Sequence, residues 1–529
     1  MRTAGRWDTR GSTTPAWSRS GVRAVNAFVD PMRNLCRSRL TRIAALLAAA
    51  GAASMAFADP LGEFSREDDV GAVSRPLAAA YDDATRTYTI GASGANMWGA
   101  EDAFGFAWKQ VTGDIALAAD IAFATPSRQG HRKAGLVFRQ SLDAGSPYAD
   151  VMVHGDGHAS LQFRSEAGGP TRTIQCPVTA PRRVRLEKRG PYVSLALAGA
   201  DGVFSPSGCA IRLDLAGPFY AGLAVCAHDN TAFETAMFSS VVFGAPPPPA
   251  ATRTSALEVI TFASLDRRVV YRAAGRMEAP HFSPDGTALF FNRDGRIHRV
   301  AVSGGEVPAV IDTGFAIHCI DDHGLSPDGT QLVISDFTAE GKSLMYLVPA
   351  GGGAPKRIAV AAPAYWHGWS PDGRTLAYCA GRNGEYDVYT TPVAGGPETR
   401  LTTAPGTDNG PDYSADGRWI YFYSDRTGHI QVWRMQADGS NQEQVTNDDY
   451  DNRFPHPSPD GKWIVFLSTK VPPIHGDPAP GDYLLRAIPA GGGVPREIAR
   501  FFGGNGSFNV PCWSRDSTRL AFATYEPGS

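Results

Sequence analysis

A Ser-Pro-Asp-Gly sequence recurs through the second half of the chain at a nearly constant spacing. Its serine falls at positions 283, 326, 370, 414, 458 and 514, with SADG at the fourth copy and SRDS at the last, so successive copies are 43, 44, 44, 44 and 56 residues apart. The proline presets φ for a β-turn, the aspartate can bond back to the backbone, and the glycine tolerates a positive φ. Strand-rich units with this period are typical of the blades of a β-propeller.

The strands around each turn predict how the propeller closes. In the fullest copy, residues 452–468, the turn is followed by the apolar run 463–467, which favours a strand buried on both faces. The last copy ends after one further strand, whereas residues 257–273 supply two strands without a preceding turn. We therefore expect residues 256–529 to form a six-bladed ring, closed by pairing these two fragments in one blade.

The N-terminal half has a different all-β pattern. Residues 59–243 contain short strands separated by Gly, Asp and Pro, which predicts an antiparallel sandwich, and the Pro-rich segment 244–255 predicts a stiff linker. The stretches GDIALAADIAF and HRKAGLVFRQSLDAGSPYADVMVHGDGHASLQFRSEAGG resemble the concanavalin A-like lectin and glucanase sandwiches of secreted bacterial proteins. The resemblance implies a jelly-roll domain of a kind that often binds glycans.

Four residues of this domain are candidates for glycan contact: Trp98, Trp108, Tyr148 and His154. The alternative is that the two tryptophans, which flank a Gly-rich loop, pack the interior, as large aromatic side chains mostly do. We find no closely spaced acidic motif on a strand of the kind that a glucanase carboxylate pair would need. We therefore expect this domain to bind or pack rather than catalyse.

The first 58 residues are typical of a secretory signal with an N-terminal extension. Arg33, Arg37, Arg39 and Arg42 precede the apolar run 43–53, and Ala56-Phe57-Ala58 follows as a small-x-small cleavage pattern. The apolar run is about half the ~20 residues that span a bilayer, so a membrane anchor is the weaker alternative. We expect translation to start at Met32 and the mature chain to begin at Asp59, in the periplasm or outside the cell.

Charge and cysteine content restrict the remaining possibilities. The formal net charge of −3 indicates no attraction to nucleic acid or to an anionic membrane. Export permits disulfides, and we expect a bridge between Cys176 and Cys209, whereas Cys226 and Cys379 look like residues inside strands. No Cys-x-x-Cys or His-x-x-x-His spacing supports a structural zinc site.

The repeated turns, together with the Gly-Gly turns between them, resemble the β-propeller of TolB, the periplasmic component of the Tol system, and of secreted TolB-like proteins. The resemblance covers roughly residues 257–525 and implies the fold. TolB carries a small α/β domain before its propeller, whereas here the lectin-like domain occupies that place.

The segments that lead into the turns predict a functional site. The innermost strand of each blade runs along the central channel, so residues just before each turn should ring one channel mouth. The candidates for ligand binding are Glu278, His281, Asp322, His323, Trp366, His367, Asp408, Asn409, Asn452, Arg453, His456 and Asn509. His323 and His367 both lie three residues before their serine, and with acidic neighbours they could hold a divalent metal ion.

Three interpretations of this ring stay open. The polar residues could bond strand ends between blades, bind a glycan or an envelope protein, or act as a carbohydrate-active enzyme, either an oligosaccharide lyase or a glycoside hydrolase, with or without a metal. The propeller oligogalacturonate lyases resemble this repeat, but their ligand spacing is not reproduced. The serine chemistry of prolyl oligopeptidases is disfavoured, because no Gly-x-Ser-x-Gly occurs, and neither a Walker A loop nor a Rossmann fingerprint is present. We expect an exported, monomeric binding protein.

Overall fold

The computed structural model describes residues 61–126, 129–249, 253–382, 384–470 and 480–527. Regular structure in these residues is β-strand throughout, apart from the 3-10 helix η1 (Asn505–Ser507). None of the described segments forms a helix with the length and apolar character to cross a bilayer. The predicted signal, its cleavage after Ala58 and the start at Met32 lie outside the described residues. The predicted all-β class is confirmed.

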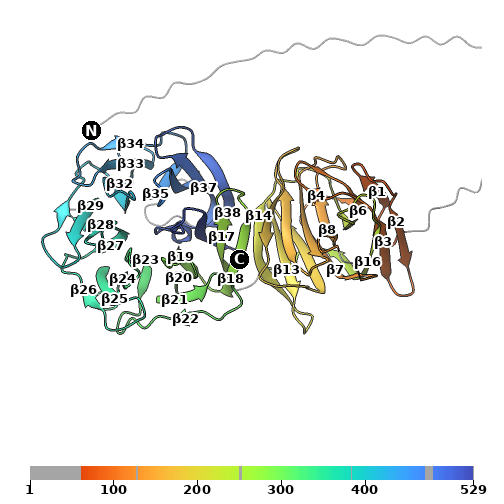
Figure 1. The fold of residues 1–529 in the computed structure, drawn as a ribbon, viewed down its shortest axis with the longest axis horizontal. Helices are drawn as coiled ribbons and strands as arrows, with labels where there is room; N and C mark the ends of the chain where they lie inside the picture. Colours follow the sequence, from red (N-terminus) through yellow and green to blue (C-terminus); the bar gives the residue numbers. More distant parts are fainter. Residues whose placement is uncertain (1–60, 127–128, 250–252, 383, 471–479, 528–529) are drawn as a thin grey trace, which may run out of the picture. The chain divides into compact units, whose positions relative to one another are not determined.

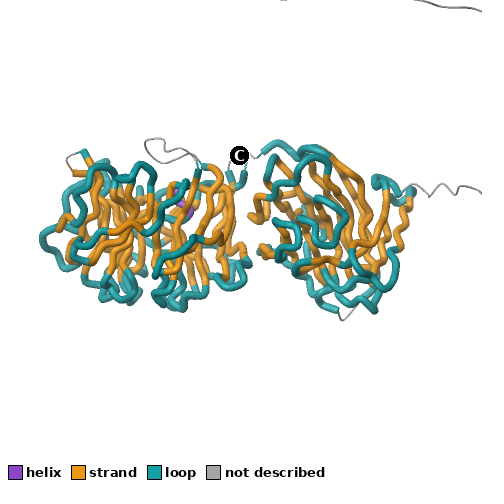
Figure 2. The backbone as a smooth tube through the Cα atoms, turned by 90° about the horizontal axis from the view of Figure 1, so that it is seen from above, coloured by secondary structure: helices purple, strands orange, loops and turns teal. Residues whose placement is uncertain are grey.

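Two antiparallel sheets make up the N-terminal half, which we call the two-sheet domain (Figures 1 and 2). The first sheet runs in the order β1 (Arg66–Val70), β6 (Phe104–Val111), β15 (Phe219–Cys226), β8 (Lys133–Arg139), β9 (Tyr148–His154), β10 (Ala159–Arg164) and β11 (Arg172–Gln175). The second runs β14 (Phe204–Arg212), β13 (Tyr192–Ala198), β12 (Arg183–Arg189), β7 (Ile115–Phe123), β16 (Glu234–Gly244), β3 (Thr87–Ala92) and β2 (Ala78–Asp82). A short hairpin, β4 (Met97–Trp98) and β5 (Glu101–Asp102), forms a two-stranded sheet of its own.

Alternating residues of both sheets meet in one apolar core. Leu117 and Leu186 of the second sheet and Leu136, Val151 and Leu161 of the first belong to this core and are fully buried. The alternation follows from the two-residue period of a strand, which sends every second side chain to the same face. The two-layer arrangement is all-β, and its assignment to the concanavalin A-like class stays a prediction.

Two of the four predicted glycan contacts of this domain lie in the interior, and His154 is half-buried. Tyr148 is fully buried and Trp108 is 8% exposed, with its indole nitrogen donating to Asp68 Oδ2 at 2.9 Å. Trp98 is 38% exposed. Burial of Trp108 favours the packing alternative for this tryptophan.

The expected bridge between Cys176 and Cys209 is not formed. Their Sγ atoms lie 3.2 Å apart and both residues are free cysteines in this structure, whereas a disulfide requires about 2.05 Å. Cys226 and Cys379 are buried in strands, as predicted.

Five four-stranded antiparallel sheets form the blades of the propeller, and in Figure 1 the inner strands β19, β23, β27 and β35 lie nearest the centre of the ring. The blades are β19 (Met277–Phe282), β20 (Ala288–Arg293), β21 (Arg296–Ala301), β22 (Ala309–Val310); β23 (Cys319–Leu325), β24 (Gln331–Asp336), β25 (Leu344–Pro349), β26 (Lys356–Arg357); β27 (Ala364–Trp369), β28 (Thr375–Arg382), β29 (Glu385–Pro392), β30 (Thr399–Arg400); β31 (Asp408–Tyr413), β32 (Trp419–Ser424), β33 (Gln431–Gln436), β34 (Glu443–Gln444); and β35 (Asp451–Pro457), β36 (Trp463–Thr469), β37 (Gly481–Pro489), β38 (Arg496–Gly503).

The repeated turn joins the first two strands of each blade. In the fullest copy, Ser458 Oγ donates to Asp460 Oδ1 at 2.6 Å and accepts from the backbone N–H of Trp463 at 3.0 Å. Gly461 has φ +71°, a value that favours glycine. The turn therefore has the physical basis that its sequence predicts, with the serine fixing the aspartate.

The prediction of six such blades is wrong in its count. The expected pairing of the strand after the linker with the C-terminal strand is present, since β17 (Thr254–Thr261) pairs with β39 (Arg519–Tyr525) and with β18 (Arg267–Ala274). These three strands, however, stand at the end of a ten-stranded sheet beyond β11. Residues 505–513, expected to supply an innermost strand, form η1 and a segment whose only β-bridge joins Trp513 to Leu520. Pro511, which lacks a backbone N–H, weakens this segment as a strand.

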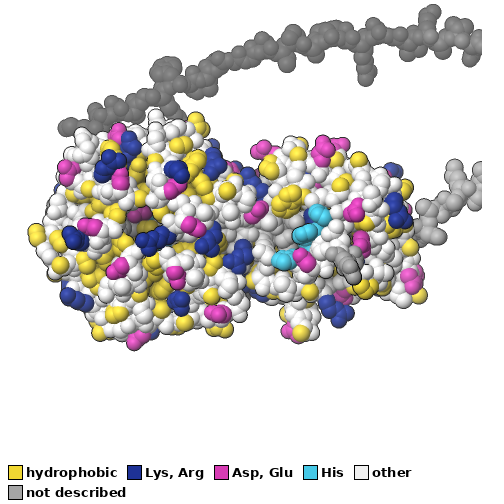
Figure 3. All heavy atoms as spheres, viewed as in Figure 1, with side chains coloured by type: hydrophobic (Ala, Val, Ile, Leu, Met, Phe, Trp, Pro, Cys, Tyr) yellow, Lys and Arg dark blue, Asp and Glu magenta, His cyan; other side chains and the backbone are white. Residues whose placement is uncertain are grey.

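Charged side chains are interspersed over the propeller on the face shown in Figure 3. This mixture agrees with the small net charge of −3.

Candidate functional site

Irregular pairing in each inner strand decides where the predicted site residues point. The register shifts between Glu278 and His281 in β19, between Asn409 and Asp412 in β31, and between Arg453 and His456 in β35. Such β-bulges bend a strand and re-aim its side chains. Residues before and after such a shift can therefore face different surroundings, as Asn409 and Asp412 do, which line two different cavities.

The first part is a cavity of about 530 Å³, which we call the strand-start cavity because most of its walls come from the beginnings of the inner strands. A size of this order is ordinary for a small-molecule site. It is lined by Ile320, Asp321, Asp322, Phe337, Tyr365, His367, Tyr386, Thr407, Asn409, Tyr423, Asp425, Ile430, Arg453, Phe454, Asn505 and Asn509.

The second part is a cavity of about 480 Å³ beside the repeated turns, which we call the turn-side cavity. Prolines and tryptophans provide much of its wall, among them Pro284, Pro327, Pro371, Pro459, Trp366, Trp369 and Trp513. Two of its indoles are already bonded: Trp369 Nε1 donates to Gly324 O at 3.3 Å and Trp513 Nε1 donates to His456 O at 3.0 Å. This cavity therefore combines the faces of prolines and tryptophans with polar side chains such as Asp412 and Arg515.

The predicted ring residues divide between these two places and the protein interior. The strand-start cavity contains Asp322, His367, Asn409, Arg453 and Asn509, and the turn-side cavity contains His281 and Trp366. The remaining five line neither: Glu278, His323, Asp408, Asn452 and His456.

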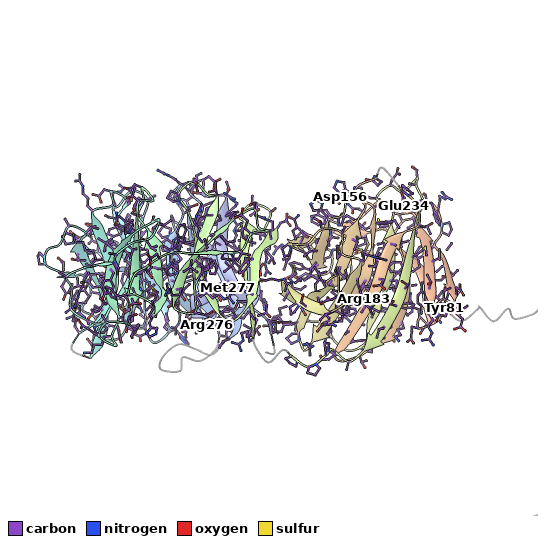
Figure 4. All side chains as sticks on the ribbon, turned by 90° about the horizontal axis from the view of Figure 1, so that it is seen from below. Tyr81, Asp156, Arg183, Glu234, Arg276 and Met277 are labelled. Carbon is purple, nitrogen blue, oxygen red and sulfur yellow. The ribbon has the colours of Figure 1, made fainter. Side chains whose placement is uncertain are left out.

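Three of those five make structural contacts. Asp408 accepts two hydrogen bonds from Arg426 at 2.8 and 2.7 Å. Asn452 Oδ1 accepts from Arg486 at 2.6 Å and from Ser468 at 2.8 Å. Glu278 forms an ion pair with Arg276 at 2.6 Å, at the start of β19, where Arg276 is labelled in Figure 4. Asp408 and Asn452 thus connect strands within their blades, whereas the Glu278 pair joins β19 to the residue just before it.

The two histidines proposed as metal ligands have different neighbours. His323 is fully buried with its ring centroid 5.1 Å from that of His281, whereas His367 Nε2 lies 3.9 Å from Asp322 Oδ1 and its ring packs on Phe454. In the part of the chain that the structure describes, no group of three or more His, Cys, Asp or Glu side chains is placed to hold a metal ion. The donor set therefore does not fit a divalent metal, and we derive no step through one.

Burial and neighbouring side chains determine the charge and the hydrogen bonds of the residues that line the strand-start cavity. Burial lowers the pKa of His367 to about 3, with a smaller contribution from His456, so the imidazole is neutral at physiological pH. Asp322 Oδ1 accepts a hydrogen bond from Asn509 Nδ2 at 2.7 Å. Arg453, only 8% exposed, lies over the ring of Tyr423 with 5.8 Å between its guanidinium carbon and the ring centroid.

Several lining residues were not among the sequence candidates. Phe337 follows the end of β24, Asp425 follows the end of β32, and Tyr386 lies at the start of β29. Because neighbouring strands of a blade are antiparallel, the end of the second strand lies beside the start of the first. That topology is the signal that could have identified them.

Aromatic and planar polar groups meet in this cavity. Tyr386 is 40% exposed and its ring centroid lies 6.2 Å from that of Tyr365. Asp425 Oδ1 accepts from the backbone N–H of Thr407 at 2.7 Å, which holds that carboxylate in place. The cavity thus combines aromatic surface with carboxylate, amide and guanidinium groups.

Comparison with known proteins identifies relatives of the propeller. A family model described as the TolB beta propeller domain matches residues 326–473. An uncharacterized protein of Agrobacterium fabrum is 42% identical over 279 residues, which is 53% of this chain and 95% of that protein. A solved structure assigned as a TolB of Agrobacterium tumefaciens is also 42% identical, with a TM-score of 0.51, covering 52% of this chain and all of that one.

TolB of Acinetobacter baumannii is more distant, at 19% identity and a TM-score of 0.34, over 48% of this chain and 64% of that one. The 42% identity, which extends over 95% of the Agrobacterium fabrum protein, decides the assignment. Through its propeller, the chain belongs to the TolB-like β-propeller family.

Proposed function

We propose that the protein is an exported binding protein that holds a carbohydrate in the strand-start cavity. The observation that carries this proposal is the composition of the cavity wall, where tyrosines stand beside planar hydrogen-bonding side chains. Tyr365 and Tyr386 offer ring faces for the apolar side of a sugar, and Asn409, Asp322 and Arg453 line the same space. Sugars have apolar faces and many hydroxyl groups, so they match such a wall.

The location of the protein follows from the same proposal. The charged and apolar pattern of residues 1–58 supports export, and membership in the TolB-like family supports the periplasm. The two-sheet domain supports glycan binding through its resemblance to lectin-like sandwiches. N-terminal sequencing of the exported protein checks this part, and residues found before Asp59 would contradict it.

A glycan panel tests the binding proposal directly. Purified protein is titrated with neutral, acidic and amino oligosaccharides, and heat release is measured by calorimetry. We expect saturable binding that Tyr386→Ala and Asn409→Ala each weaken at least fivefold. Arg515→Ala, a change in the turn-side cavity, is the matched control and should leave binding unchanged. Absence of binding to every glycan, with binding to envelope proteins instead, would replace the carbohydrate with a protein partner.

Catalysis is the second candidate, because Asp322 and His367 stand side by side in the cavity with 3.9 Å between Oδ1 and Nε2. A carboxylate and an imidazole are groups that can transfer protons. The low pKa of His367, about 3, makes this imidazole a weak base, which favours binding over turnover. Analysis of glycan products after incubation, with and without a chelator, separates the two, since turnover lost in His367→Ala would establish an enzyme.

A further inference from the structure

Arg453 differs from the other largely buried arginines of the described chain, because it has no carboxylate partner. It lies on β35, its side chain forms no ion pair or hydrogen bond with another described residue, and its Nε is buried without a partner. The other buried arginines pair with acids: Arg132 with Glu234, Arg139 and Arg164 with Asp102, Arg267 with Glu258, and Arg486 with Asp448.

A guanidinium removed from water and left without an anion is costly, so a buried arginine is normally paired. Arg453 instead lines the strand-start cavity, where its guanidinium lies over the ring of Tyr423. Its planar fork suits a carboxylate, which it can bind through two parallel hydrogen bonds. The position of this unpaired cation points to an anionic group on the ligand.

The rest of the wall limits how much negative charge the ligand can carry. Asp321 and Asp425 line the same cavity and are half-buried, and Asp322 is held by Asn509. Three carboxylates against one guanidinium repel a ligand with several negative charges. A single carboxylate can meet Arg453, while uncharged hydroxyl and amide groups face the aspartates.

We propose that the ligand is a sugar that carries one carboxylate, bound by Arg453, with the remainder of the sugar uncharged or basic. This inference rests on the proposed carbohydrate binding and adds the class of sugar. The inference excludes polyuronates as ligands, because they carry one carboxylate on every sugar unit.

Three probes test the proposal with the full-length exported protein. N-Acetylmuramic acid and N-acetylglucosamine differ by a single lactyl ether that bears the carboxylate, and trigalacturonate carries three carboxylates. We expect N-acetylmuramic acid to bind at least tenfold more tightly than N-acetylglucosamine, and trigalacturonate to bind more weakly than N-acetylmuramic acid. Binding of N-acetylmuramic acid should weaken as salt concentration rises.

The variant Arg453→Gln should weaken the binding of N-acetylmuramic acid at least tenfold and so remove the difference between the first two probes. Arg515→Gln, which removes a cation from the turn-side cavity, is the control and should keep the difference. Thermal unfolding and circular dichroism confirm that both variants fold.

The outcomes separate this inference from the function on which it rests. Equal affinity for the two N-acetyl sugars, or tightest binding of trigalacturonate, overturns the single carboxylate while carbohydrate binding stands. A preference for N-acetylmuramic acid that survives Arg453→Gln overturns the role of Arg453. If no sugar in the wider glycan panel binds, the proposed function itself fails, and this inference fails with it.

Discussion

Asp412 and His456 join two neighbouring inner strands of the propeller through one buried contact, with 3.0 Å between Oδ2 and Nδ1. Asp412 is on β31 and His456 on β35, and both are less than one-tenth exposed. Burial raises the pKa of Asp412, and the hydrogen bond and charge of His456 oppose that rise. The pair therefore stabilises the carboxylate where solvent does not reach it.

We expect His456→Ala to lower the free energy of unfolding by about 3–5 kcal/mol, because removal of one partner leaves a buried group uncompensated. Urea unfolding followed by tryptophan fluorescence measures the change. The double variant Asp412→Ala, His456→Ala should be less destabilised than the sum of the single variants. A single-variant loss below about 1 kcal/mol would contradict the pairing.

Two other buried histidines predict a loss of stability at mildly acidic pH. Burial lowers the pKa of His281 to about 4 and that of His367 to about 3, against about 6.5 in an unfolded chain. The folded state thus favours the neutral imidazoles, so their contribution is complete above pH 6.5 and is lost as pH falls toward 4 and 3. Melting temperatures measured from pH 7.5 to 4.5 should fall, and His281→Gln should make the decline shallower.

The aspartates of the repeated turns predict a second loss at lower pH. The serine hydroxyl is the largest cause that lowers the pKa of Asp416 and of Asp516 to about 2. A depressed pKa stabilises the folded state above pH 4, and this contribution disappears as pH falls from about 4 to 2. Both carboxylates are largely solvated, so each effect is small. Asp416→Asn should flatten the pH dependence of the melting temperature below pH 4, and an unchanged slope would count against the turn as its source.

The free thiols of Cys176 and Cys209 predict a bridge under oxidising conditions. Their Sγ atoms are 3.2 Å apart, so a small shift of the side chains reaches bonding distance. Protein refolded in oxidised glutathione should lose two mass units, localised to the peptides that contain these residues. Cys209→Ser is the control, and persistence of both free thiols would contradict the prediction.

Much of the fold could be predicted because the repeated turn has its own local chemistry. The serine, aspartate and glycine of residues 458–461 fix a turn through local contacts, and five copies each join the first two strands of a four-stranded blade. The blade expected at the sixth copy could not be predicted from the turn alone. Its inner strand is absent from residues 505–513, where η1 and a segment containing Pro511 stand instead. Local chemistry predicted the turns, whereas long-range strand pairing determined the number of four-stranded blades.

The candidate site was harder to predict because β-bulges do not show in the spacing of residues. Arg453 and His456 are three positions apart on one strand, yet Arg453 lines the strand-start cavity and His456 does not. Phe454, between them, has φ +50°, an uncommon value for a residue with a side chain. Nothing in its sequence context indicates that conformation.

Arg267 and Arg453 offer a last test, since both are buried and only one is paired. Arg267 on β18 donates two hydrogen bonds to Glu258 of β17 at 2.7 and 2.8 Å, and Glu258 also accepts from Thr524 of β39 at 2.8 Å. Arg267→Gln would leave the Glu258 carboxylate buried without its cation and should lower the free energy of unfolding by about 3–5 kcal/mol.

Arg453→Gln removes a buried cation that has no carboxylate partner, so the same measurement should show a change within about 1 kcal/mol or a gain in stability. Urea unfolding of both variants beside the wild type gives the comparison. If Arg453→Gln destabilises the protein as much as Arg267→Gln, the guanidinium is part of the scaffold. If only Arg267→Gln does so, Arg453 is held in the cavity at the expense of stability, as is common for residues that bind a ligand.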